Sequence, residues 1–151
     1  MKALALSGAG QPPRVLVLDY RRLNLIEKKR GSGVLVLDDD RFMLEMLKDM
    51  LHTIGVREVY TEASTRHALS TLAEQGPDVL ICDLALPDMD GIEFLQAAAE
   101  RGFRGGVILL SGMDPGGRDA AGELARALGL RVAGIFRKPI ALDQLCSAVS
   151  R

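Results

Sequence analysis

The stretch Val79-Leu80-Ile81-Cys82-Asp83-Leu84-Ala85-Leu86-Pro87-Asp88-Met89-Asp90-Gly91 contains the two features on which the fold prediction depends. Its first four residues are apolar and show no alternation with polar ones. Continuous runs of this kind are typical of strands that are buried on both faces of a parallel sheet. A carboxylate, Asp83, follows directly, and the Pro and Gly further on indicate a loop that leads into a helix. The stretch therefore predicts a buried strand that ends in an acidic side chain.

Three more apolar runs have the same character and predict further strands buried on both faces: Val34–Leu37, Val107–Leu110 and Val132–Phe136, the last interrupted by Ala133 and Gly134. A weaker run, Val56–Thr61, fits a more exposed strand near the edge of the sheet. The chain thus predicts five strands.

Helical patterns lie between these runs. A 3.6-residue period of apolar residues predicts a helix that ends at Gly55. Ser64 or Thr65 can cap a second helix, which Gly76-Pro77 stops. Further helices are predicted over 91–101, 118–128 and 142–150. Five strands, each followed by a helix, predict an α/β fold with a parallel sheet and helices on both faces.

Composition limits the classes of function. The 151 residues suffice for one ordinary domain, and 48% hydrophobic with 26% charged residues is a globular balance. The net charge of -1 gives no reason to expect nucleic acid as a partner. No apolar run approaches the roughly 20 residues needed to cross a membrane. We interpret Cys82 and Cys146 as buried, reduced thiols, which suits a cytoplasmic location.

Residues 1–32 lie outside the strand–helix pattern, which occupies residues 33–151. Gly31-Ser32-Gly33 is typical of a flexible joint. Two hypotheses remain open for the first 32 residues. They form either a flexible or loosely docked extension, or an extra strand or helix that covers a sheet edge or joins two protomers.

Polar residues follow four of the predicted strands, and the carboxyl ends of parallel strands form the ligand-binding edge of such sheets. The groups are Asp38-Asp39-Asp40, Asp83, Ser111-Gly112 and Lys138-Pro139. Clustered carboxylates need protons or a cation, and Mg²⁺ prefers oxygen ligands. A lysine and a serine can bind phosphoryl oxygens, with Gly112 leaving space beside the serine, and a carboxylate attacking phosphorus forms an acyl phosphate. The edge therefore predicts phosphoryl chemistry with a metal ion.

Each of these residues also has a simpler explanation. Asp40 is best interpreted as the N-cap of the first helix, and Asp38 and Asp39 could share that role. Ser111 and Lys138 are uninformative when each is taken alone. The functional hypothesis depends on their joint occurrence after successive strands.

Residues 33–151 resemble the receiver domain of bacterial two-component response regulators over its full length. Four stretches carry the resemblance: Val34–Asp39, Asp83–Gly91, Leu110–Gly112 and Lys138-Pro139. The resemblance implies a flavodoxin-like, doubly wound sheet with the strand order 2-1-3-4-5. It also implies a Lys138-Pro139 bond that is often cis.

The resemblance further implies the roles of the site residues. Asp83 would accept a phosphoryl group from a sensor histidine kinase or phosphotransfer protein. Asp39 would bind Mg²⁺ directly, Asp38 through water, and Asp83 and the backbone carbonyl of Ala85 would complete the set. The phosphoryl group would be contacted by Ser111 and Lys138. The domain would then act on a downstream effector or fused output domain, as a monomer or homodimer, with no enzymatic activity beyond its own phosphotransfer and dephosphorylation.

Two details refine this expectation. The stretch Ala127–Gly134 is similar to receivers fused to EAL-type cyclic di-GMP phosphodiesterases. The position in the fifth strand that usually holds an aromatic switch residue is Ile135, so another element would have to report phosphorylation. We expect residues 113–117 and the following helix, which is rich in alanine and glycine, to move most on phosphorylation.

Other interpretations compete with the receiver. A haloacid-dehalogenase-type phosphatase also has an Asp-x-Asp after its first strand, which Asp38–Asp40 matches, but it leaves Asp83 and the loop after it unexplained. A receiver-like interaction module without phosphorylation would not need the full acidic set. Flavin binding is disfavoured because the first loop is acidic where a phosphate-binding loop is needed.

Overall fold

The computed structural model describes residues 33–86, 91–112 and 115–150. The expectations for residues 1–32, and for residues 113 and 114, lie outside the described part. In chain order the elements are β1(Gly33–Leu37), α2(Arg41–Thr53), β2(Glu58–Glu62), α3(Thr65–Gln75), β3(Val79–Asp83), α4(Gly91–Glu100), β4(Gly106–Ser111), α5(Pro115–Ala127), β5(Arg131–Arg137) and α6(Leu142–Val149).

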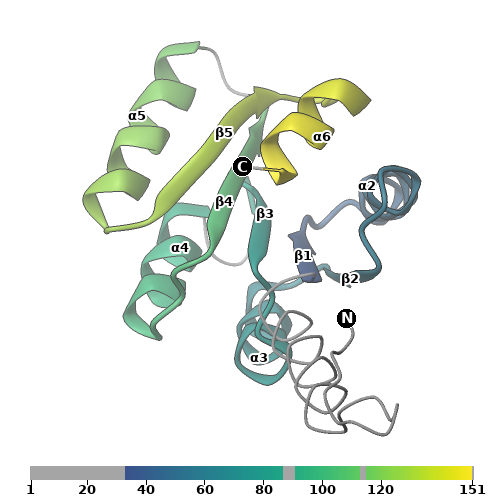
Figure 1. Cartoon of the computed structure of the whole chain (residues 1–151). Helices are drawn as coiled ribbons and strands as arrows, with labels where there is room; N and C mark the ends of the chain where they lie inside the picture. The colour runs from purple at the N-terminus through teal and green to yellow at the C-terminus, as the bar shows by residue number, and fades with distance from the viewer. Residues whose placement is uncertain (1–32, 87–90, 113–114, 151) are drawn as a thin grey trace, which may run out of the picture.

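The five strands form one parallel sheet in the order β2-β1-β3-β4-β5. Helices α2 and α6 cover one face, and α3, α4 and α5 cover the other (Figure 1). This arrangement confirms the predicted doubly wound, flavodoxin-like fold and its strand order. Because all strands run in the same direction, their carboxyl ends share one edge.

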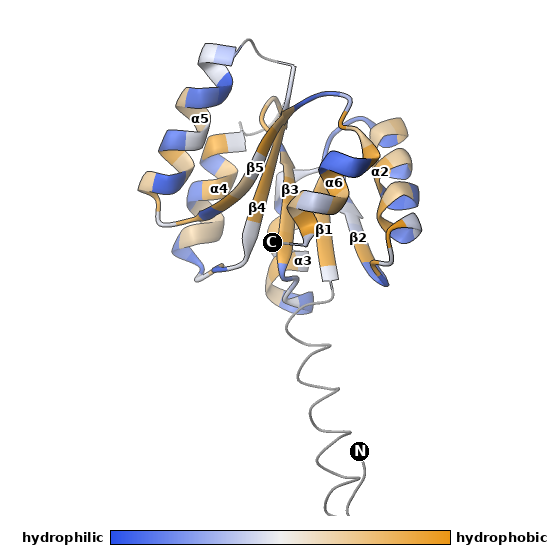
Figure 2. Cartoon of the chain, turned by 45° about the horizontal axis from the view of Figure 1, so that its top comes forward, coloured by the Kyte–Doolittle hydropathy of each residue, from blue (hydrophilic) through white to orange (hydrophobic). Residues whose placement is uncertain are grey.

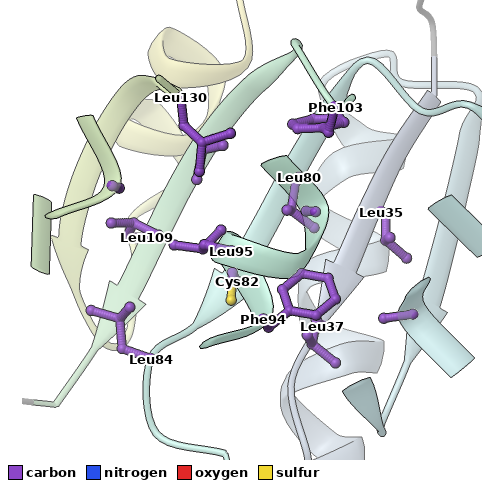
Figure 3. Close-up of a cluster of buried hydrophobic side chains, with 14 of the residues drawn as sticks. Leu35, Leu37, Leu80, Cys82, Leu84, Phe94, Leu95, Phe103, Leu109 and Leu130 are labelled. Atoms are coloured by element: carbon purple, nitrogen blue, oxygen red, sulfur yellow. The ribbon is translucent and has the colours of Figure 1, made fainter. Parts of the chain in front are cut away.

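Two hydrophobic cores hold the layers together. Strand side chains alternate between the faces, so Leu35 and Leu80 pack towards α3 and α4, while Val36 and Ile81 pack towards α2 and α6. Hydrophobic residues gather on the strands and on the helix faces turned to the sheet (Figure 2). Figure 3 shows the first core, in which the ring of Phe94 from α4 lies among aliphatic side chains of the sheet.

The observed burial agrees with the sequence prediction for β1, β3 and β4 and differs from it for β5. All residues of β1, β3 and β4 are buried, as their continuous apolar runs predict. The prediction that Val132–Phe136 is buried on both faces was wrong, because β5 is half-exposed at the edge of the sheet. Small residues and a bulge interrupt this strand, and within the described part of the chain no strand pairs with its outer side. The predicted edge position of β2 is confirmed.

The ends of the helices follow the predicted caps. Asp40 caps α2, where its side chain accepts a hydrogen bond from the backbone N–H of Phe42. Ser64, not Thr65, caps α3. Gly55 and Gly76 have positive φ angles of 101° and 56° just after their helices, where glycine avoids strain.

Two other details differ from the sequence prediction. Helix α5 begins at Pro115 and not at residue 118, because proline is tolerated in the first turn of a helix. Cys82 is a buried free thiol, but Cys146 is exposed, so its predicted burial was wrong. On α6 the sheet-facing positions belong to Leu145 and Ala148, which turns the side chain of Cys146 outward.

Among the described residues, no helix has the length and apolar character to cross a membrane.

Candidate functional site

The carboxyl ends of β1, β3, β4 and β5 bring the predicted polar residues together. Backbone hydrogen bonds fix this edge: Leu84 donates to the carbonyl of Leu110 at 3.1 Å, and Lys138 donates to that of Ser111 at 3.0 Å. The register pairs Asp83 with Leu110 on the neighbouring strand. Each polar residue thus occupies a fixed position, set by main-chain pairing and not by its own side chain.

Three carboxylates form a cluster at this edge. Asp38, Asp39 and Asp83 each offer an oxygen, and these oxygens lie within 4.8 Å of one another. Asp38 and Asp83 are buried, with exposed fractions of 1% and 3%, whereas Asp39 is exposed. Buried carboxylates this close together repel each other unless a cation or proton joins them. The third carboxylate of the first loop, Asp40, serves as the helix cap.

Lys138 supplies one such cation. Its Nζ lies 2.9 Å from Oδ2 of Asp38 and 3.1 Å from Oδ2 of Asp83. Burial by itself would lower the pKa of Lys138, but the hydrogen bonds and negative charges of Asp38 and Asp83 outweigh it and raise the pKa. The lysine is therefore charged and bridges two acidic side chains from different strands.

The environment of Asp83 disfavours its ionised form. Burial raises the pKa of Asp83, and the negative charge of Asp38 adds to this effect. The backbone N–H of Ala85, which donates to Oδ1 at 3.1 Å, and the ammonium of Lys138 act in the opposite direction but do not cancel it. A divalent cation close to Asp83 would therefore stabilise its carboxylate.

The donor set fits a hard divalent cation such as Mg²⁺. All side-chain ligands in the cluster are carboxylate oxygens, the type that this ion prefers. Among the described residues, the buried Oδ2 of Asp38 has no neighbouring donor other than the Lys138 ammonium. An exposed Asp39 beside this oxygen leaves the cluster open to solvent on one side. Both buried and accessible oxygens are therefore present for a partly hydrated ion.

The remaining predicted residues also lie at this edge. Ser111 is fully buried at the end of β4, between the ends of β3 and β5. A Cβ added at Gly112 would meet nothing within 4 Å, so there is open space beside the serine. The Lys138-Pro139 peptide bond is cis. The sequence predicted that Ser111, Gly112 and Lys138 lie at this edge, whereas the cis bond was implied only by the resemblance to receiver domains.

Gly91 has a steric role that was not predicted from the sequence. A Cβ at this position would lie 2.6 Å from Cα of Leu84 and 2.8 Å from the carbonyl oxygen of Asp83. The Gly91 N–H also donates to the carbonyl of Leu84 at 3.1 Å. The start of α4 is thereby held against the backbone that carries Asp83. A glycine at the first residue of a predicted helix was the signal, because glycine is unfavourable inside helices.

Residues 34–150 match the response regulator receiver domain. The chain belongs to this family. Receiver domains are phosphoacceptors in two-component signalling, so the predicted class of function is confirmed. The family match also favours the receiver over the phosphatase and flavin-binding interpretations.

Known relatives agree with this assignment. The chain is 33% identical over 120 residues to the cyclic di-GMP phosphodiesterase RocR of Pseudomonas aeruginosa, covering 79% of this chain and 31% of RocR. It is 28% identical over 110 residues to the regulator of RpoS of Escherichia coli, covering 73% and 31%. The chain thus spans about a third of the length of these relatives. The predicted likeness to receivers of cyclic di-GMP phosphodiesterases is confirmed.

Solved structures show the same fold. A response regulator from Colwellia psychrerythraea superposes with a TM-score of 0.67 at 36% identity, covering 78% of this chain and 93% of that one. Chemotaxis protein CheY4 of Vibrio cholerae gives a TM-score of 0.66 at 27% identity, covering 79% and 96%.

Proposed function

We propose that Asp83 is the phosphoacceptor of this receiver domain, with a histidine kinase or a phosphotransfer protein as the donor. A carboxylate oxygen of Asp83 forms a bond to phosphorus while the bond from phosphorus to the donor's imidazole nitrogen breaks. The electron pair of the broken bond stays on that nitrogen. The product is an aspartyl phosphate, and the receiver changes its interaction surface in response.

One observation carries the proposal: Lys138 contacts Asp38 and Asp83 together, at 2.9 and 3.1 Å. A phosphoryl group on Asp83 would bring its own negative oxygens within reach of this ammonium. The lysine could then exchange its carboxylate contact for a phosphoryl contact. Such an exchange would couple the chemistry at Asp83 to β5, which carries Lys138 at its end.

The metal-binding residues in this proposal are Asp38, Asp39, Asp83 and the backbone carbonyl of Ala85. Bound Mg²⁺ would neutralise the carboxylates and the charge that develops on the phosphoryl oxygens. The close packing of the three carboxylates supports this part of the proposal. The buried hydroxyl of Ser111 would hydrogen-bond a further phosphoryl oxygen from the β4 side.

For the domain division and the output, we propose only the general arrangement and the class of partner. Residues 33–151 would form the receiver, and residues 1–32 an extension to it. The chain would signal to a downstream effector or output domain, without nucleic-acid binding and with no catalysis beyond its own phosphotransfer. Free Cys82 and Cys146 fit a cytoplasmic location. The phosphodiesterase activity named for RocR belongs to a protein about two and a half times as long, so it supports only the general kind of output that this receiver would control.

The test is incubation with acetyl phosphate and Mg²⁺, followed by intact-mass measurement. The parent should gain the mass of one phosphoryl group, and Asp83→Asn should gain none. Asp40→Asn is the matched control, because asparagine caps helices as well as aspartate does and Asp40 lies outside the carboxylate cluster. Asp39→Asn, or chelation of the metal, should abolish the gain. Phosphate on Asp38 would support a phosphatase instead, and no gain in the parent would support an interaction module.

A further inference from the structure

A groove opens at the amino-terminal edge of the sheet, at the opposite end of the strands from Asp83. It lies between the C-terminal ends of α3 and α4 and has a volume of about 580 Å³. Leu72 and Phe103 line it, with exposed fractions of 8% and 9%. Figure 3 shows Phe103 at one end of the core cluster and Leu84 at the other. The groove therefore continues the apolar core to the surface.

Two arginines border this groove. Arg101 and Arg104 are exposed, and their Nη1 atoms donate to the carbonyls of Ala97 at 3.4 Å and Phe103 at 2.9 Å. Within the described ranges, neither guanidinium forms an ion pair with a carboxylate. An apolar lining beside two such cations suits a segment with aliphatic side chains next to an acidic one.

The N-terminal segment joins the domain at the rim of this groove. Its connection is Gly33, whose carbonyl accepts a hydrogen bond from the N–H of Asp78 at 2.9 Å. A Cβ on Gly33 would lie 3.7 Å from Cα of Pro77. Both Pro77 and Asp78 line the groove. Residues 1–32 are therefore tethered next to it, which gives any contact a high effective concentration.

The sequence of the segment complements the groove. It contains Val15-Leu16-Val17-Leu18-Asp19, four aliphatic residues followed by a carboxylate. At roughly 3.3 Å per residue, the chain between Asp19 and Gly33 can reach roughly 45 Å, so length sets no limit. Residues 1–32 carry seven Lys and Arg against two Asp and Glu, while residues 33–151 carry twelve against eighteen. Net charges of +5 and -6 attract the segment to the domain as a whole.

We propose that residues 15–19 bind in the α3–α4 groove of their own chain. The aliphatic side chains pack on Leu72 and Phe103, and Asp19 pairs with Arg101 and Arg104. This docking covers the end of the sheet that lies opposite the phosphorylation site. It is independent of the proposed function, because no residue of the groove belongs to the carboxylate cluster.

Paramagnetic relaxation enhancement in the full chain tests the proposal. A nitroxide is attached at Glu74→Cys, an exposed position on α3 beside the groove, in a Cys146→Ser background, while buried Cys82 remains. We expect broadening of the amide signals of residues 15–19. A label at Glu45→Cys, exposed on α2 across the sheet, is the control and should leave these signals sharp. Absence of broadening with the first label, or equal broadening with both, overturns the proposal.

Two further comparisons identify the partner and the contacts. Mixing isotope-labelled chain with spin-labelled chain should cause no broadening, and broadening there would mean that a second copy is bound instead. Leu16→Asp with Leu18→Asp should abolish the effect, whereas Leu4→Asp with Leu6→Asp should keep it. Arg101→Glu with Arg104→Glu should weaken it, and adding Asp19→Arg should restore it. Failure of this charge exchange to restore broadening would contradict the proposed ion pairs.

Discussion

Nζ of Lys138 lies 3.1 Å from Oδ2 of Asp83, although their strands, β5 and β3, are not neighbours. Strand β4 lies between them, so the lysine reaches across the end of β4 to the carboxylate. The same ammonium contacts Asp38 at the end of β1. A single cation thereby connects the central strands to the edge strand.

Replacing Lys138 should destabilise the metal-free protein. In Lys138→Met, the buried carboxylates of Asp38 and Asp83 lose their cation, and we expect the free energy of unfolding to fall by about 1–3 kcal/mol. Urea denaturation measures this loss. Mg²⁺ should reduce it, because the metal ion replaces the missing charge. Lys48→Met on α2, which has no carboxylate partner among the described residues, should stay within about 0.5 kcal/mol of the parent.

Asp83→Asn should stabilise the metal-free protein at neutral pH. Burial raises the pKa of Asp83 above 3.8, so the folded state favours the protonated carboxyl. This contribution to stability is complete below the unfolded pKa and is lost as the pH rises through the folded pKa. The neutral amide avoids the loss, and we expect a gain on the order of 1 kcal/mol at pH 7.

The pH dependence provides the check on this prediction. In urea titrations, the difference between Asp83→Asn and the parent should shrink as the pH falls towards about 4, where the parent carboxyl becomes protonated. Asp119→Asn, at an exposed position on α5, is the control and should show no such difference. A difference that is constant with pH would contradict the assignment to Asp83 ionisation.

Gly91→Ala should disturb the backbone next to the phosphorylation site. The new methyl group would lie 2.6 Å from Cα of Leu84, so α4 or the end of β3 must move. We expect a loss of about 1–3 kcal/mol in the free energy of unfolding, with slower labelling by acetyl phosphate. Gly112→Ala is the matched control for stability, since its Cβ meets nothing within 4 Å. Equal stabilities of the two variants would disprove the steric role.

Helix α5 should respond most to phosphorylation. Its buried positions are Ala121, Gly122 and Ala125, whereas α4 buries Phe94 and Leu95, so α5 is held by less apolar area. Ile135, at the position of the usual aromatic switch residue, packs against Gly122 and leaves no space for a Cβ there. Beryllofluoride with Mg²⁺ should therefore change amide hydrogen exchange more in α5 than in α4. Unchanged exchange in α5, or a larger change in α4, would refute this prediction.

The sequence predicted much of the fold and the site because both follow local rules. Apolar runs without alternation predicted β1, β3 and β4, and the residues after them supplied the site. Side-chain chemistry alone predicted the cap at Asp40 and narrowed the second cap to Ser64 or Thr65, of which the structure shows Ser64. The burial of β5 was predicted wrongly, since hydrophobicity does not show which strand lies at the edge. Cys146 was misassigned because a short helix allows more than one inward face.

The succession of strands and helices along the chain, and the identity of the residues at the carboxyl ends of the strands, were determined by the sequence, because patterns of apolar residues and caps act over only a few positions. Tertiary structure decided which of those side chains touch. The distances from Lys138 to two carboxylates, the burial that raises the pKa of Asp83 and the close approach of Gly91 depend on how sheet and helices pack. Burial and charge–charge contacts arise between residues distant along the chain, so local patterns contain no measure of them.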